Sequence, residues 1–398
     1  MRKIFFICLL ILNGCASTMQ SHLDKIQTDF ANGNFESYTK DSDIKTTNNL
    51  DLLIDATALF HKNKFRESDD AFEEFNNRNI KETTTSISRE TTALLFGGGV
   101  NSYKPYMFDS LFVSYYQIWN LLALSDWANA RVVINQSYER QKNMSIEYEK
   151  LVEQNKNKLA KATELTKELN KNQTDWAAFT DIMNPALMYL SGIYFLNDGD
   201  FATAETYLKR ANGMMPENTA IKTDLENAQK HIKPTNTTWV FTESGFAPRL
   251  TEENFGLFLP SIGMVYFNIS TPQFLPTKHT PNNSELLDDV DKMFMTEFNE
   301  YRINEILRTY AGTVAKTTLQ STMYHSGSDS APLLGILSTI YTISSSNSDV
   351  RTWATLPKYI SVQRINTTNL QEPEITGNNL VYIREHDKIT DKKIIKLK

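Results

Sequence analysis

The stretch from Asn184 to Pro216 has the residue spacing of two helices that cross closely on either side of a tight turn. The helical patterns meet at Asp198-Gly199-Asp200, and the small residues Gly192 and Ala204 allow the two helices to approach each other. Pro216 ends the second helix, because proline disrupts the hydrogen bonds of a helix interior. The bulky side chains that fill the space between the helices are Phe195, Phe201 and Leu208.

This order of small and bulky residues resembles a tetratricopeptide repeat, a helix-turn-helix unit of about 34 residues. One such unit cannot bury its apolar face alone, so we expect neighbouring units. Ser110 to Gln141 repeats the pattern around a turn at Ser125-Asp126-Trp127, and Leu50 to Ile80 repeats it more weakly around Asn63-Lys64-Phe65. A partial fourth turn lies at Asn32 to Phe35. The uneven spacing of these turns predicts an irregular helical array.

The beginning of the sequence, MRKIFFICLLILNGC, has the features of a bacterial secretion signal. Its apolar run from Ile4 to Leu12 is too short for a membrane span, which needs about 20 residues. The segment that ends at Cys15 resembles a lipobox, in which the cysteine is acylated and becomes the mature N-terminus. Cys15 has no second cysteine outside the signal with which to form a disulfide, so we expect it to be lipidated rather than incidental. By resemblance to lipoprotein sorting rules, Ala16 after it implies the outer membrane, facing the periplasm.

Length and charge narrow the class of protein. With 398 residues, 40% of them hydrophobic and 22% charged, the chain is expected to form two globular domains. A net charge of −6, spread over the chain, argues against a nucleic-acid partner. Most of the prolines follow residue 230, which indicates a change of architecture there. The predicted units are a lipoprotein signal at 1–15, a helical repeat domain at 16–230, a linker at 231–238 and an α+β domain at 239–398.

Two internal segments have simple interpretations. Lys142 to Gln173 has no proline or glycine and carries many charged residues around sparse leucines, so we predict a long exposed helix or hairpin. A solvated charged face is favoured there over a coiled-coil partner site. Gly97-Gly98-Gly99 lacks the Lys-Ser or Lys-Thr of a phosphate-binding loop and is interpreted as a flexible connector.

The pattern changes to short β-type runs after the linker. The predicted strands are Thr238 to Thr242, Phe255 to Ile269 with internal breaks, Lys358 to Ile365 and Leu380 to Arg384. Between them, we expect helices at Ser284 to Gln320 and at Leu333 to Ile343. The predicted fold class is therefore a mainly α N-terminal part of irregular tetratricopeptide-like repeats, followed by an α+β module.

The sequence contains no recognisable catalytic or metal-binding motif. It has neither the Gly-x-Ser-x-Gly elbow of a hydrolase nor the helix motif of a zinc protease. The six histidines are scattered without metal-ligand spacing, at His22, His61, His231, His279, His325 and His386. We therefore predict no catalytic residue, no metal and no cofactor. A carboxylate pair assembled by the fold is an open alternative.

The candidate partner-binding residues lie in two motifs of the C-terminal half. Trp and Arg are frequent anchors at protein interfaces, and glycine and proline give each motif a defined backbone path. The residues are Glu243, Gly245, Pro248, Arg249, Arg351 and Trp353. An alternative, which we favour, is that both motifs are structural corners. In that case Trp353 fills the core and Arg351 pairs with Glu243.

Several motifs together resemble a family of poorly characterised bacterial outer-membrane lipoproteins. They are the lipobox, Tyr103 to Tyr106, Ala130 to Val132, Glu243 to Pro248 and Asp349 to Pro357. Members of that family are often encoded beside a lipoprotein that resembles the activator of a penicillin-binding protein, which implies a role in envelope or peptidoglycan biogenesis.

Together with the repeats, this resemblance predicts a lipid-anchored scaffold in the periplasm that binds protein partners of the envelope. An accessory role in outer-membrane-protein assembly or secretion is an alternative. An enzyme that acts on the cell wall is less favoured.

Overall fold

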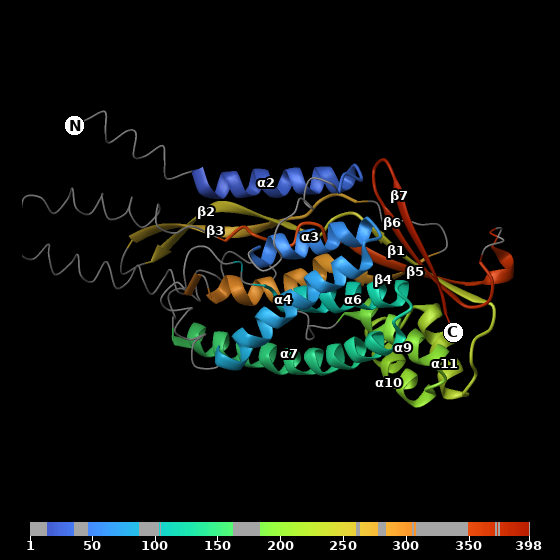
Figure 1. Ribbon diagram of the computed structural model, residues 1–398. Helices are drawn as coiled ribbons and strands as arrows, with labels where there is room; N and C mark the ends of the chain where they lie inside the picture. Colours follow the sequence, from blue (N-terminus) through green and yellow to red (C-terminus); the bar gives the residue numbers. More distant parts are fainter. Residues whose placement is uncertain are drawn as a thin grey trace, which may run out of the picture.

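Helices make up the first part of the chain and a mixed sheet follows them, as Figure 1 shows. This computed structural model describes residues 14–35, 47–86, 103, 105–161, 184–259, 263–277, 284–304, 306–307, 349–370, 372 and 375–397. Residues 1–13 of the predicted signal, the glycine triplet at 97–99 and the helix predicted at Leu333 to Ile343 lie outside these residues. The order of elements confirms the predicted fold class, α followed by α+β.

The helices pair as hairpins where the sequence predicts them: α3 packs on α4, α6 on α7 and α9 on α10. Each turn contains a residue with positive φ, at Asn63 (58°), Ser125 (57°) and Gly199 (82°). The described helices are α2 (Gly14–Ala31), α3 (Asn49–His61), α4 (Phe65–Ser86), α6 (Met107–Ala123), α7 (Trp127–Lys161), α9 (Pro185–Asp198), α10 (Phe201–Met214) and α11 (Thr219–Gln229).

The α9–α10 hairpin shows why this sequence turns where it does. Asn184 caps α9 by accepting a hydrogen bond from the N–H of Leu187 at 2.7 Å. Gly199 ends α9 in the left-handed conformation, which glycine adopts without steric cost. At Gly192 the two helices come so close that a Cβ would lie 2.6 Å from Leu208 Cδ2. The close approach predicted for the small residues is therefore confirmed.

The Gly192→Ala variant is expected to lower the free energy of unfolding by about 1 to 2 kcal/mol, because Leu208 is fully buried and must shift. The matched control is Gly213→Ala on α10, where a Cβ meets nothing within 4 Å. That change is expected to raise stability by about 0.5 to 1 kcal/mol through helix propensity. Chemical denaturation of both variants measures the difference, and equal stabilities would contradict the close contact.

The α6–α7 hairpin departs from prediction in its length. α7 runs unbroken for 35 residues, so the separate helix predicted at Lys142 to Gln173 is, over its described part, the second half of α7. Its inner face is covered by a helix at 290–304, where Asn155 Nδ2 donates to Glu300 Oε2 at 2.6 Å. The charged residues of this half are exposed, as predicted, whereas the face with Tyr148 and Asn155 is buried because a helix from the C-terminal part packs against it.

The strands form two sheets. Five of the described strands follow the order β4-β5-β1-β6-β7, in which β1 runs parallel to β6 and the other neighbours are antiparallel. β2 and β3 form a separate antiparallel hairpin. The strands are β1 (Thr237–Ser244), β2 (Arg249–Leu259), β3 (Gly263–Gln273), β4 (Glu285–Asp289), β5 (Tyr359–Asn366), β6 (Asn379–Glu385) and β7 (Thr390–Lys396).

Two boundaries differ from the sequence prediction. The last residues of the predicted linker, Thr237 and Thr238, already belong to β1. The helix predicted from Ser284 begins only at residue 290, because β4 precedes it and pairs with the edge of β5. Pairing with a neighbouring strand can override a local helical pattern.

The hydrophobic core joins the helices to the five-stranded sheet. Phe241 on β1 contacts Trp119 of α6 and Tyr189 of α9, with ring centroids 5.5 Å and 5.9 Å apart. Buried residues of both parts belong to one cluster. The helical array therefore covers one face of the sheet and brings the helix turns to the strands. Among the described helices, none is both long and apolar enough to cross a bilayer.

Candidate functional site

The two predicted partner-binding motifs meet in the structure. Ala247 N donates to Leu356 O, and Lys358 N donates to Ser244 O, each at 3.0 Å. These bonds join the chain that leaves β1 to the chain that enters β5. The two motifs therefore form a single corner of the fold, although more than a hundred residues separate them in the sequence.

The chain's own N-terminal helix covers one side of this corner. Arg249 forms an ion pair with Asp24 of α2, and Gln27 Nε2 of α2 donates to Ala354 O at 2.9 Å. Pro248 is buried beside them. The contacts that the sequence analysis assigned to an unknown partner are thus partly made within the chain.

Gly245 fixes the turn of the corner. Its φ of 64° lies in the left-handed region, and a Cβ there would come within 2.4 Å of Thr277 Oγ1. Glycine satisfies both requirements, because it tolerates positive φ and has no Cβ.

Trp353 fills the core beneath the corner. Its side chain is buried, and Nε1 donates to Thr57 Oγ1 of α3 at 3.0 Å. This confirms the interpretation in which the tryptophan is part of the core. The predicted pairing of Arg351 with Glu243 is wrong: Arg351 Nη2 lies 2.7 Å from Asp349 Oδ2. Asp349, two residues earlier in the same loop, reaches the guanidinium locally, whereas Glu243 is fully buried.

Glu243 instead pairs with Arg384 of β6, which the sequence analysis did not select. Arg384 Nη1 lies 2.9 Å from Glu243 Oε2, which also accepts hydrogen bonds from the hydroxyls of Tyr382 (2.8 Å) and Tyr116 (3.0 Å). Burial raises the pKa of Glu243, and the Arg384 guanidinium opposes that rise. The parallel register of β1 and β6 sets Glu243 opposite Arg384. The alternation in Leu380, Tyr382 and Arg384 was the available sequence signal.

Of the six candidate residues, Glu243, Pro248 and Trp353 are buried in this fold. The side chains of Arg249 and Arg351 are 18% and 20% exposed. The corner therefore presents little more than two partly exposed, already paired guanidinium groups to solvent. The contacts of the corner hold α2, α3 and α6 on the sheet.

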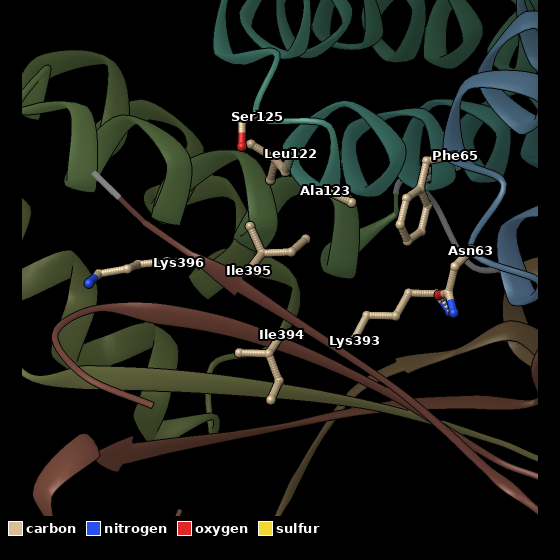
Figure 2. A pocket seen from close by; sticks show the side chains of 9 residues that line it. All are labelled: Asn63, Phe65, Leu122, Ala123, Ser125, Lys393, Ile394, Ile395 and Lys396. Carbon is tan, nitrogen blue, oxygen red and sulfur yellow. Dashed lines mark hydrogen bonds between the residues drawn. The ribbon is translucent and has the colours of Figure 1, made fainter. Parts of the chain in front are cut away.

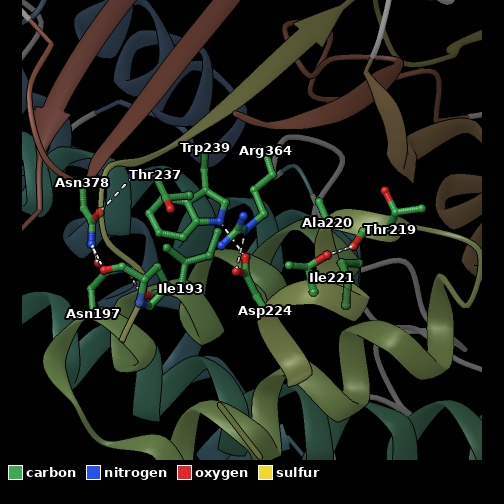
Figure 3. A network of polar contacts seen from close by, with 12 residues as sticks. Ile193, Asn197, Thr219, Ala220, Ile221, Asp224, Thr237, Trp239, Arg364 and Asn378 are labelled. Carbon is green, nitrogen blue, oxygen red and sulfur yellow. Dashed lines mark hydrogen bonds and ion pairs between the residues drawn. The ribbon is translucent and has the colours of Figure 1, made fainter. Parts of the chain in front are cut away.

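A second buried network holds α11 on the sheet (Figure 3). Asp224 of α11 accepts hydrogen bonds from Tyr189 Oη (2.7 Å), Trp239 Nε1 (2.6 Å) and Arg364 Nε (2.8 Å). Burial raises the pKa of Asp224, and Arg364 opposes that rise. These groups are saturated by each other, which indicates a structural role.

Two buried carboxyls lie at the start of α6. Glu297 accepts hydrogen bonds from Met107 N (2.5 Å) and Phe108 N (3.1 Å), and Asp109 accepts one from Tyr106 N (2.9 Å). Burial raises the pKa of Asp109 to about 7 and that of Glu297 to about 8. Both groups satisfy backbone N–H donors at the start of α6, so they serve as helix caps.

Histidines that are scattered in the sequence come together beside β7. His61 Nδ1 lies 2.9 Å from Asp391 Oδ2, and its ring is 5.4 Å from that of His386, edge to face. Burial lowers the pKa of His61 to about 4 and that of His386 to about 3. Lys393 Nζ completes the cluster at 2.7 Å from Asp391 Oδ2. The spacing along the sequence gave no signal for this cluster.

A cavity of about 330 Å³ lies next to this cluster (Figure 2). One wall consists of four consecutive residues of β7, 393–396. The opposite wall consists of residues at the turns after α3 and α6: Asn63, Phe65, Leu122, Ala123 and Ser125. Lys393 crosses from one wall to the other and donates to Asn63 Oδ1 at 2.9 Å. We call this space the β7 slot.

The β7 slot runs along the edge of the strand. Successive side chains of a strand point to opposite faces, so a cavity that touches four consecutive residues must lie beside the backbone. β6 occupies the other edge of β7, and within the described strands nothing pairs with this one. An unpaired strand edge presents backbone donors and acceptors to another chain.

No metal site accompanies these features: within the described part, no group of three or more His, Cys, Asp or Glu residues is placed to hold an ion. Comparisons with protein-family models, with curated proteins and with solved structures gave no match.

Proposed function

We propose that this chain is an outer-membrane-anchored periplasmic lipoprotein that acts as a protein-binding scaffold in envelope or peptidoglycan biogenesis. We further propose that its docking site is the β7 slot. The observation that carries the docking site is the contact of one cavity with four consecutive residues of an unpaired strand. A partner segment in extended form would add beside β7 as a further strand, at a spacing of about 4.8 Å.

The walls of the β7 slot define the chemistry of the partner. Phe65, Leu122 and Ile395 are apolar, so they favour apolar side chains at alternate positions of the added strand. A volume of about 330 Å³ is at the lower limit for a drug-sized ligand but is suitable for a few side chains. The partner segment is therefore extended and carries apolar residues that enter the slot.

The positive charge around β7 favours an acidic partner segment. Residues 388–398 contain five lysines and a single aspartate, in a chain whose net charge is −6. Lys392 is paired with Glu372 and Lys393 with Asp391, whereas no described carboxylate pairs with Lys396 on the wall of the slot. A second copy of β7 would set lysines against lysines, which is unfavourable. Carboxylates on the partner would meet Lys396 instead.

Anchoring at the membrane rests on the sequence. The signal and lipobox support lipidation at Cys15, and several acyl chains on one residue give stable anchoring where a single chain does not. The family resemblance supports a role in the envelope. An anchored chain with a docking slot would hold its partner near the membrane surface.

Photo-crosslinking in intact cells tests this function. Benzoylphenylalanine placed at Phe65 and at Ile394, on opposite walls of the slot, is expected to give the same protein adduct. The control position is Val132 of α7, which at 49% exposure is as accessible as Ile394 at 44% and more accessible than the half-buried Phe65. Lys396→Glu is expected to reduce the adduct about tenfold or more, because like charges oppose docking. Adducts that form equally at Val132, or that persist with Lys396→Glu, would contradict docking in the slot.

Fractionation of the same cells tests the anchor. The Cys15→Ser protein is expected to stay uncleaved, because the lipobox lacks its cysteine, and therefore to be absent from the outer-membrane fraction and to lose the adduct. If Cys15→Ser is processed and fractionates like the wild type, the lipoprotein proposal is wrong even where crosslinking succeeds.

A further inference from the structure

The hairpin of β2 and β3 changes character along its length. Near its base, polar side chains bond across the strands: Asn268 Nδ2 donates to Glu252 Oε1 (2.9 Å), and Thr271 Oγ1 donates to Glu253 Oε2 (3.1 Å). Beyond Glu253, the next charged residue in the sequence is Lys278. In a chain with 22% charged residues, so long an uncharged stretch indicates that this part of the hairpin lies in apolar surroundings.

The far part of the hairpin is apolar on both faces. We call residues 255–259 and 263–267 the apolar end. Its cross-strand neighbours include Phe255 with Phe267 and Leu257 with Val265, and on the opposite face Phe258 with Met264. A ribbon of two strands has no core of its own and cannot bury both faces. Phe258 is 52% exposed, so the apolar end needs a cover.

The direction of the hairpin places its apolar end near Cys15. Arg249 at the start of β2 is paired with Asp24 in the middle of α2, and β2 extends from there toward the end of the molecule at which α2 begins (Figure 1). About 14 Å of helix separates Asp24 from Cys15, and about 20 Å of strand separates Arg249 from Phe255. The apolar end therefore begins at roughly the level of Cys15.

We infer that the apolar end of the β2–β3 hairpin inserts into the lipid leaflet in which the acyl chains of Cys15 reside. This inference rests on the proposed anchor at Cys15. The five residue pairs of the apolar end span about 16 Å, close to half of a hydrocarbon core of about 30 Å. Hairpin and acyl chains would then hold the molecule at two points and fix its orientation on the membrane.

Vesicle binding tests insertion without the acyl chains. The probe is a vesicle of phosphatidylethanolamine and phosphatidylglycerol, and the protein is the mature chain from residue 15 with Cys15→Ser. This protein is expected to sediment with vesicles, and Phe258→Asp is expected to weaken binding about tenfold or more, because it removes an inserted aromatic side chain. The matched control is Ile232→Asp in the loop after α11, where the native residue is 49% exposed. It should bind like its parent.

A second measurement reports insertion directly. Phe258→Trp is expected to gain tryptophan quenching by lipids brominated on their acyl chains, whereas Ile232→Trp is not. Equal melting temperatures of all variants would show that differences come from the membrane. The inference is overturned if Phe258→Asp binds vesicles as its parent does, or if Phe258→Trp shows no added quenching.

These results are separate from those of the proposed anchor. Loss of vesicle binding by the lipid-free chain, with normal fractionation of the lipidated protein in cells, overturns only the hairpin inference. Quenching at Phe258→Trp together with normal signal processing of Cys15→Ser in cells supports insertion of the hairpin and overturns the anchor.

Discussion

The Arg384→Met variant is expected to lose about 3 to 5 kcal/mol of unfolding free energy, because it leaves the Glu243 carboxylate without its counter-charge. Glu243 and Arg384 have relative exposures of 0% and 1%, so water cannot replace the lost guanidinium. The same side chain also donates to Gly245 O at 2.7 Å and thereby supports the turn of the corner. Urea denaturation at neutral pH measures the loss.

Two further variants test whether the loss of stability comes from the buried charge of Glu243. Lys230→Met breaks an exposed pair with Glu226 one helical turn away and is expected to stay close to the wild type. Adding Glu243→Gln to Arg384→Met removes both charges while it keeps an acceptor for Tyr116 and Tyr382, so it should recover part of the lost stability. Equal effects of Lys230→Met and Arg384→Met would show that the Glu243 pair is not buried.

Local spacing is sufficient to predict the helical hairpins, because the residues that define each one lie within a single repeat. Gly192 and Leu208 meet across a turn whose position Gly199 fixes, and all three are visible in one short stretch of sequence. The same reasoning places the turns at Asn63 and Ser125, which the structure shows with positive φ. Short-range steric requirements therefore account for most of the predictable part of the fold.

Strand register accounts for most of what the sequence analysis missed. Glu243 and Arg384 lie on strands far apart in the sequence, and only the parallel register of β1 and β6 sets them opposite each other. The local motifs predict Arg351 as the partner of Glu243, because the two residues lie in similar clusters. The pairing of Arg351 with Asp349 shows that a local carboxylate can satisfy such a residue first.

Burial separates the two interpretations of the candidate corner. The tryptophan and arginine of an interface and those of a core have the same appearance in a sequence, because both environments select large side chains with polar ends. Trp353 bonds to Thr57, and Arg249 pairs with Asp24. Each of these contacts joins residues more than two hundred positions apart in the sequence, so no local pattern indicated them. The β7 slot was missed for the same reason, since each wall comes from a different part of the chain.

Acidification from pH 7 to pH 4 is expected to remove about 3 kcal/mol of stability through His61 alone. Its pKa falls to about 4 in the folded protein from 6.5 in the unfolded chain, because its side chain is fully buried. The unfolded state therefore binds the proton more tightly. The stability contributed by the neutral, buried His61 is complete above pH 6.5 and is lost as the pH falls. The loss levels off below about pH 4. Asp391 favours the charged form of His61, but Arg384 and Lys393 oppose it.

The pH dependence of the wild type alone would not isolate this effect. Burial raises the pKa of Asp69 to about 6, of Asp109 to about 7 and of Glu297 to about 8, so these carboxyls stabilise the fold below neutral pH and weaken it as the pH rises. They are common to the wild type and to His61→Asn, so their contributions cancel in the difference between the two proteins.

His61→Asn keeps a donor near Asp391 but cannot take up a proton, so it isolates the titration of His61. The stability advantage of the wild type over this variant is expected to shrink by about 2 kcal/mol between pH 7 and pH 5, and by about 3 kcal/mol at pH 4. Denaturation of both proteins across this range measures it, with His22→Asn on the exposed face of α2 as a histidine control outside the cluster. A difference that does not change with pH would mean that water reaches His61 in the folded protein. In that case the contacts between α3 and β7, which also form the end of the β7 slot, would be looser than the Asp391 and Lys393 bonds imply.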